Sequence, residues 1–177
     1  PTYYAYSLEA AYKLFHYGAI INNFDGSVEA ESCGCELEWK GEFENPVISK
    51  GCDFLKLGPE DFVKKGRIPI LFEVNKRLVM SLCRETAIVG VLTGPCSLVK
   101  CLQGEWGNSG YDHIHEAISL VGSFLTRLVR NLCEIKTDGI FIREDLLGKN
   151  FWEELGLLKD SYKAVFTTLF NLIRAYN

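Results

Sequence analysis

The feature that most constrains the fold is an alternation of short apolar runs with longer amphipathic segments. Residues 87–95 (AIVGVLTGP) form a continuous apolar run that ends at Gly94 and Pro95. Such runs are typical of parallel strands covered on both faces. Two further short runs occupy residues 19–26 (AIINNFDG) and 139–145 (GIFIRED). We therefore expect an α/β protein with parallel strands.

Helical periodicity is strongest over residues 112–136, where apolar side chains recur every three or four positions. Ser7 is a candidate N-cap for a first helix over residues 7–17. Residues 33–49 alternate in polarity and contain turn formers, which favours a small hairpin or an extended excursion. The other predicted helices occupy residues 59–66, 68–83, 96–102 and 159–176.

Composition excludes several classes of protein. Hydrophobic residues make up 47% and charged residues 24%, the balance of a soluble globular chain. A net charge of −4 argues against a nucleic-acid partner, which would need surplus Lys and Arg. No apolar run approaches the ~18 residues of a membrane span. Seven scattered cysteines do not suggest a disulfide framework, so we expect reduced thiols in a cytoplasmic protein.

Polar side chains follow each predicted strand, where ligands bind in parallel α/β folds. Asp25 could accept hydrogen bonds from a cationic or N–H-bearing ligand, and it could equally cap the following helix. Glu144 and Asp145 are adjacent on an extended backbone, so at most one of them faces the ligand. The candidate residues at the three strand ends are Asn22, Asn23, Asp25, Thr93, Gly94, Pro95, Arg143, Glu144 and Asp145.

No set of metal ligands is recognisable in the sequence. Cys33 and Cys35 would share one face of a strand, but zinc would need two more ligands at a recognisable spacing. His113 and His115 are two residues apart and would not share one face of a helix. We therefore expect no metal site from these residues.

Three segments, taken together and in order, resemble the uroporphyrinogen decarboxylase superfamily. They are residues 18–39 (GAIINNFDGSVEAESCGCELEW), 89–104 (VGVLTGPCSLVKCLQG) and 137–148 (TDGIFIREDLLG). The resemblance covers essentially the whole chain. It implies a (β/α)₈ TIM barrel with its active site at the carboxyl ends of the strands.

The resemblance implies two chemistries. The decarboxylase of porphyrin biosynthesis removes carboxyl groups from a tetrapyrrole without a cofactor. Other members are methyltransferases that use zinc and a corrinoid protein to move methyl groups to or from thiols. Our main expectation is a lyase acting on a tetrapyrrole, and the alternative is the methyltransferase. A non-catalytic tetrapyrrole- or corrinoid-binding module is a third reading, and a homodimer is compatible with each.

Family residues carry over at a few positions only. The pyrrole-binding aspartate falls on Asp25, which the resemblance implies is catalytic. The family's active-site tyrosine falls on Cys101 and its serine on Asp145, beside Arg143. Together with the strand-end residues, these positions give a candidate substrate-binding set of Asn23, Gly94, Pro95, Cys101, Glu144 and Asp145. The decarboxylase's arginine-rich N-terminal motif and late histidine, and the methyltransferases' His-x-Cys zinc motif, have no counterpart.

Length fits only part of a barrel. A complete barrel takes about 250 residues, and the 177 residues here contain three legible strand–helix units. We expect residues 1–177 to be one partial barrel domain, a central portion without the first and last units.

Overall fold

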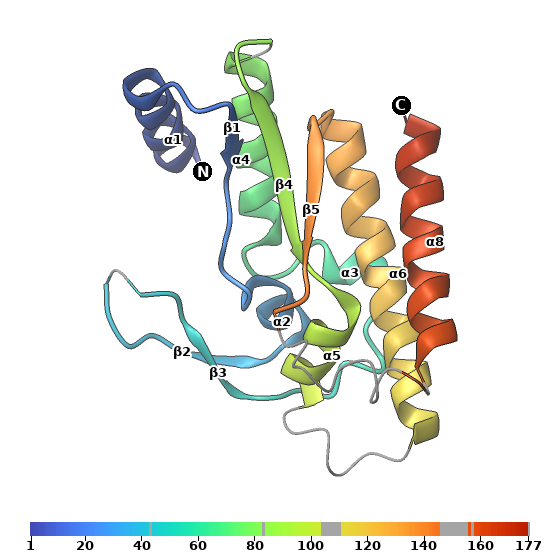
Figure 1. The fold of residues 1–177 in the computed structure, drawn as a ribbon. Coiled ribbons are helices and arrows are strands. Elements are labelled where there is room, and N and C mark those ends of the chain that lie inside the picture. Colours follow the sequence, from blue (N-terminus) through green and yellow to red (C-terminus); the bar gives the residue numbers. More distant parts are fainter. Residues whose placement is uncertain (43, 83, 104–110, 146–155, 157, 177) are drawn as a thin grey trace.

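The computed structural model describes residues 1–42, 44–82, 84–103, 111–145, 156 and 158–176. Its main sheet is parallel, as the sequence predicts, with strand order β1-β4-β5. The strands are β1 (Ala19–Ile21), β4 (Ala87–Thr93) and β5 (Gly139–Arg143). The carboxyl ends of all three strands lie at the same edge of the sheet, at the bottom of Figure 1.

Helices cover one face of this sheet. Figure 1 shows α4 (Ile68–Ser81) and α6 (Tyr111–Ile135) behind the strands, with α8 (Lys159–Tyr176) outside α6. Helix α1 (Thr2–Phe15) packs against α4. In the parts of the chain that the structure describes, no helix is long and apolar enough to cross a membrane.

Short elements gather at the carboxyl edge of the sheet (Figure 1). Helix α2 (Val28–Cys33) follows β1, and α5 (Pro95–Gln103) follows β4. Strands β2 (Glu36–Glu38) and β3 (Val47–Lys50) form the predicted hairpin. Helix α3 (Pro59–Phe62) leads toward α4. This crowding places several charged side chains next to the strand ends.

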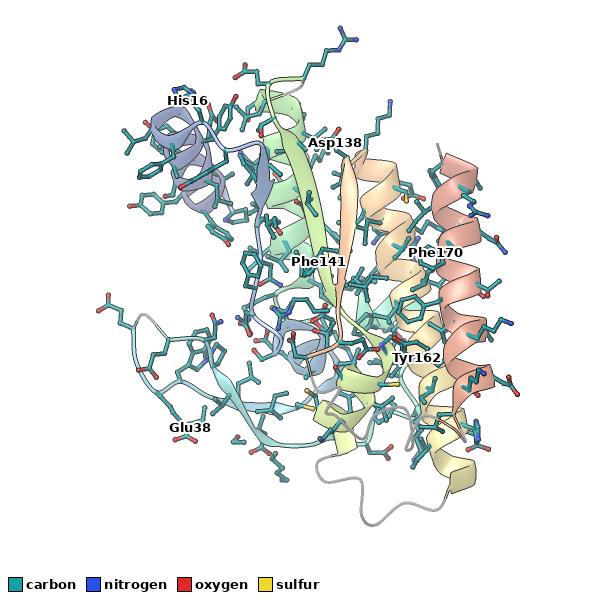
Figure 2. All side chains as sticks on the ribbon, viewed as in Figure 1. His16, Glu38, Asp138, Phe141, Tyr162 and Phe170 are labelled. Carbon is teal, nitrogen blue, oxygen red and sulfur yellow. The ribbon has the colours of Figure 1, made fainter. Side chains whose placement is uncertain are left out.

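Only one face of β4 is fully covered, which corrects the expectation of burial on both faces. Ile88 and Leu92 are buried beneath the helices, whereas Val89 and Val91 alternate with them and are half-exposed. Phe141 of β5, labelled in Figure 2, is 48% exposed. In a complete barrel, side chains from the remaining strands would fill this second face.

One local prediction was wrong, and one short helix was missed. Ser7 does not cap a helix, because α1 begins at Thr2 and the Ser7 hydroxyl donates to the Tyr3 carbonyl inside it. Helix α2 was not predicted, because its six residues are too few to show a helical period. Gly34 ends α2 at φ 104°, a conformation that favours glycine.

The predicted apolar face of α6 forms the centre of the core. Phe124 is fully buried and stacks on Phe62 of α3, with 4.6 Å between ring centroids. On its opposite side α6 packs closely against α8. A β-carbon added at Gly122 would lie 2.5 Å from a methyl group of Val165.

This close contact predicts the effect of Gly122→Ala. The extra methyl group overpacks the helix pair, so we expect a loss of about 1–3 kcal/mol in the free energy of unfolding, measured in urea. Adding Val165→Ala should remove the clash and recover part of that loss. Gly18→Ala is the control, because nothing lies within 4 Å of its added β-carbon. A Gly122→Ala variant as stable as the Gly18→Ala control would contradict this packing.

Candidate functional site

Asp25 lies in the turn between β1 and α2 and is only 8% exposed. Its Oδ1 accepts hydrogen bonds from the Ser27 backbone N–H at 2.8 Å and the Ser27 hydroxyl at 2.7 Å. Its Oδ2 accepts from Arg67 at 2.5 Å. Asp25 does not cap α2, the alternative that the sequence left open, because the N-cap position is Ser27. The carboxylate instead shapes the turn before the helix and makes an ion pair that the sequence did not indicate.

Arg67, immediately before α4, is the centre of this cluster. Its Nε donates to Glu31 of α2 at 2.7 Å, and its Nη2 donates to the Ser27 hydroxyl at 2.9 Å. The ring of Trp39 lies over the guanidinium group, 5.3 Å from its central carbon to the ring centroid. One cation thus joins the β1–α2 turn, α2 and the hairpin segment.

Arg143 joins the ends of β5 and β1. Its guanidinium group donates to the Phe24 backbone carbonyl and to Oδ2 of Asp145, with 3.0 Å from Nε to that oxygen. The Asp145 side chain is 52% exposed. The predicted pair between Arg143 and one neighbouring carboxylate is therefore confirmed. The strand ends do converge on one edge, as parallel strands require.

Glu144 points the other way from Asp145, as the alternation of an extended chain predicts. Its oxygens accept from the backbone N–H groups of Cys96 at 3.2 Å and Ser97 at 2.8 Å, at the start of α5. Burial raises the pKa of Glu144 and, together with this carboxyl group, that of Tyr162, which Figure 2 labels on α8. We assign Glu144 a helix-capping role.

Gly94 and Pro95 form the connection between β4 and α5, which Glu144 caps. A β-carbon at Gly94 would lie 2.3 Å from the Glu144 carboxyl carbon, so only glycine leaves room for this cap. Pro95 is the first residue of α5, where its missing N–H costs no hydrogen bond. Their predicted contact with substrate stays a prediction.

Asn23 is buried and Cys101 is half-buried. The Asn23 side-chain oxygen accepts the backbone N–H of Asp25 at 3.0 Å, which shapes the turn. Cys101 lies half-buried on α5 and packs against the core. Burial, and then the nearby carboxyl groups of Glu29 and Asp145, raise the pKa of Cys101. Substrate binding by Asn23 and Cys101 also stays a prediction.

Glu29 is a buried carboxyl group that the sequence did not single out. It is 3% exposed on α2, and its two oxygens accept from the Thr93 backbone N–H and hydroxyl, each at 3.0 Å. Burial raises the pKa of Glu29, and the hydrogen bonds from Thr93 only partly oppose this. Folding therefore shifts the balance at Glu29 toward the protonated form.

A cavity of about 20 Å³ lies next to Glu29, between the sheet and helices α4 and α6. It has room for about one water molecule. Asn22 and Asn75 contribute its other polar groups, and the buried Asn75 side-chain oxygen lacks a protein partner in the described part of the chain. A bound water fits this cavity, but a substrate does not.

Metal ligands are not grouped in the described ranges, where no three His, Cys, Asp or Glu side chains come close enough to hold an ion. The six described cysteines are all free thiols: Cys33, Cys35, Cys52, Cys96, Cys101 and Cys133. The zinc that the resemblance implies for the methyltransferases thus has no fitting set of ligands in this part of the chain.

Sequence reasoning missed Arg67, Glu29, Glu31 and Trp39. Arg67 pairs with a residue 42 positions away, and no local pattern marks such a partner. Glu29 and Glu31 carried one weak signal, since acidic residues favour the first turn of a helix. Trp39 gave no signal beyond its position in the hairpin segment.

The raised pKa of Glu29 predicts how stability depends on pH. A carboxyl group with a raised pKa stabilises the fold fully below its usual value of 4.5, and this contribution is lost as pH rises through the folded-state value. Glu29→Gln does not titrate, and its amide can accept from the Thr93 N–H and donate to the Thr93 hydroxyl. We expect its free energy of unfolding, relative to wild type, to increase as pH rises above 4.5.

Urea unfolding at a series of pH values from below 4.5 upward measures the difference in free energy of unfolding between each variant and wild type. Glu38→Gln, at an exposed position in β2, is the control and should show a flat difference from wild type. A difference for Glu29→Gln that is flat, or that moves in favour of wild type as pH rises, would contradict the raised pKa.

Comparison with known proteins gives consistent matches. Methylcobamide:CoM methyltransferase MtbA from Methanosarcina acetivorans is 25% identical over 165 residues, which cover 84% of this chain and 48% of the relative. A solved methyltransferase from Methanosarcina mazei superposes with a TM-score of 0.74 at 20% identity, covering 91% of this chain and 52% of that one. The chain thus spans about half the length of these relatives.

The solved relative confirms the predicted fold class, a (β/α)₈ TIM barrel of which this chain represents part. A model of uroporphyrinogen decarboxylase (URO-D) matches residues 1–144, most of the chain. These residues include both β1 with its Asp25 turn and the whole of β4 and β5. The chain therefore belongs to the uroporphyrinogen decarboxylase (URO-D) family.

Proposed function

We propose that this chain is part of an enzyme that transfers a methyl group between a corrinoid and a small thiol. The observation that carries the proposal is the sequence match with Methylcobamide:CoM methyltransferase MtbA over 84% of the chain. The proposal adopts the methyltransferase expectation in preference to the tetrapyrrole lyase. Cytoplasmic location and a homodimer stay predictions.

Exposed rings and cations at the strand ends support binding of a large, flat ligand together with an anionic group. Phe24 and Trp39 are 58% and 61% exposed there. The Phe24 backbone carbonyl accepts a hydrogen bond from Arg143, and the ring of Trp39 lies over the guanidinium group of Arg67. Exposed rings and nearby cations can contact an apolar macrocycle and a separate anionic group of the ligands. A corrin ring would supply the flat macrocycle, and because its side chains are neutral amides, the anionic group would come from the small thiol substrate or from the phosphate of the corrinoid's nucleotide loop.

The hydrogen bonds of Asp25 count against the lyase. A carboxylate has about four lone-pair sites, and three at Asp25 already accept from Ser27 and Arg67. Little capacity is left for the several N–H groups of a tetrapyrrole. The lyase is the second candidate, because the matching family model is that of uroporphyrinogen decarboxylase.

The proposed roles of this chain's own residues concern binding and orientation. Arg143 would hold an anionic group of the ligand, because a guanidinium group has five N–H donors and its bonds with Asp145 and the Phe24 carbonyl use three of them. Arg67 and Asp25 would keep the β1–α2 turn rigid beneath the ligand. We assign no step to zinc, since the described residues do not fit it.

An assay of methyl transfer tests the proposal. Purified protein is mixed with methylcobalamin and 2-mercaptoethanesulfonate, with and without added Zn²⁺, and demethylation is followed by absorbance. Arg143→Met should lower kcat/KM about 10- to 100-fold, the range for losing a charged hydrogen bond. Arg77→Met is the matched control, because Arg77 pairs with Glu73 on the exposed face of α4.

Parallel assays separate the alternatives. Release of carbon dioxide from uroporphyrinogen without methyl transfer would replace the proposal with the lyase. Binding of cobalamin with neither reaction would favour the non-catalytic module and overturn the proposed activity.

A further inference from the structure

Two thiols meet where α2 passes into the β2–β3 hairpin. Cys35 lies directly after Gly34, the residue that ends α2, and Cys52 follows β3. Their sulfur atoms are 3.2 Å apart, with Cys35 donating a hydrogen bond to Cys52. The backbone N–H of Cys52 also donates to the Leu102 carbonyl of α5, at 3.2 Å. The pair therefore sits at a junction of three elements.

The two thiols differ in access to solvent. Cys35 is buried, whereas Cys52 is half-exposed. The hydrogen bond from Cys35 lowers the pKa of Cys52, while the same bond and burial raise that of Cys35. The more exposed sulfur is thus also the one that ionises more readily, and thiolates rather than thiols attack disulfides.

We propose that Cys35 and Cys52 are a redox-active dithiol that a low-molecular-weight disulfide converts into a reversible disulfide bond. The Cys52 thiolate attacks one sulfur of the small disulfide, breaks its S–S bond and releases one small thiolate. Cys35 then loses its proton and attacks the Cys52 sulfur, which releases the second small thiolate. The two protein thiols lose two electrons, the small disulfide gains them, and the two cysteine protons go to the released thiols.

Neighbouring cysteines are placed less favourably for this exchange. Cys33 and Cys101 lie near the pair, and burial raises the pKa of both thiols. The 3.2 Å sulfur contact in this cluster joins Cys35 and Cys52. These two positions therefore form the expected disulfide, without exchange among the four.

The disulfide would constrain a segment next to the candidate site. Helix α2 carries Glu29 and Glu31 and ends just before Cys35, and the enclosed hairpin segment carries Trp39. Closing the loop reduces the freedom of the unfolded chain, so oxidation should raise the Tm. The redox activity of Cys35 and Cys52 does not depend on methyl transfer.

Mass spectrometry after incubation with oxidised glutathione tests the proposal. We expect the intact wild-type protein to lose two hydrogens, to yield a peptide pair joined through Cys35 and Cys52, and to recover its mass with dithiothreitol. Cys35→Ser should instead retain a glutathione adduct on Cys52. Cys133→Ser, at a half-exposed thiol on α6, is the matched control and should still form the disulfide.

Oxidation of the wild-type protein tests the proposal even if a variant fails to fold. A stable glutathione adduct on wild-type Cys52, a peptide pair joining Cys52 to Cys33 or Cys101, or a lower Tm after oxidation would each overturn the proposal.

Discussion

The guanidinium group of Arg67 holds together the elements that surround the strand ends. It donates to Asp25, Ser27 and Glu31, which belong to the β1–α2 turn and to α2, while Arg67 itself precedes α4. Asp25 and Arg67 are both largely shielded from water, with side chains 10% and 24% exposed. Removing one partner would leave the other charge in this shielded position, which costs far more than breaking an exposed pair.

This constraint also shapes what the site can do. With Asp25 committed to Arg67, the groups left to meet a ligand are Arg143, Asp145 and the exposed rings of Phe24 and Trp39. Burial raises the pKa values of Glu29 and Glu144. Glu29 accepts a backbone hydrogen bond at the end of β4, and Glu144 accepts one at the start of α5. They support the strand ends from within. Among the described residues, Glu29 is thus a buried support and Glu144 a half-buried one, whereas Asp145 is exposed.

Sequence patterns predicted most of the regular structure, because it depends on local periodicity. The apolar stripe of α6, the three parallel strands and the hairpin all follow from the alternation of residue types. Helix α2 escaped detection because it is short, and the start of α1 was misplaced because Ser7 is common both at caps and inside helices. The convergence of the three strand ends followed from their parallel direction. The partners of Asp25 could not be predicted, because they are far apart in the sequence.

A double-mutant cycle on Asp25 and Arg67 tests whether their pairing anchors the carboxyl edge of the sheet. Urea unfolding would compare the wild type, Asp25→Asn, Arg67→Met and the double variant. We predict a coupling energy of about 1–3 kcal/mol, because Arg67→Met leaves the shielded Asp25 without its ion pair and Asp25→Asn leaves Arg67 with only Glu31. Effects that add to within about 0.5 kcal/mol would contradict it and leave Asp25 free to act on a ligand.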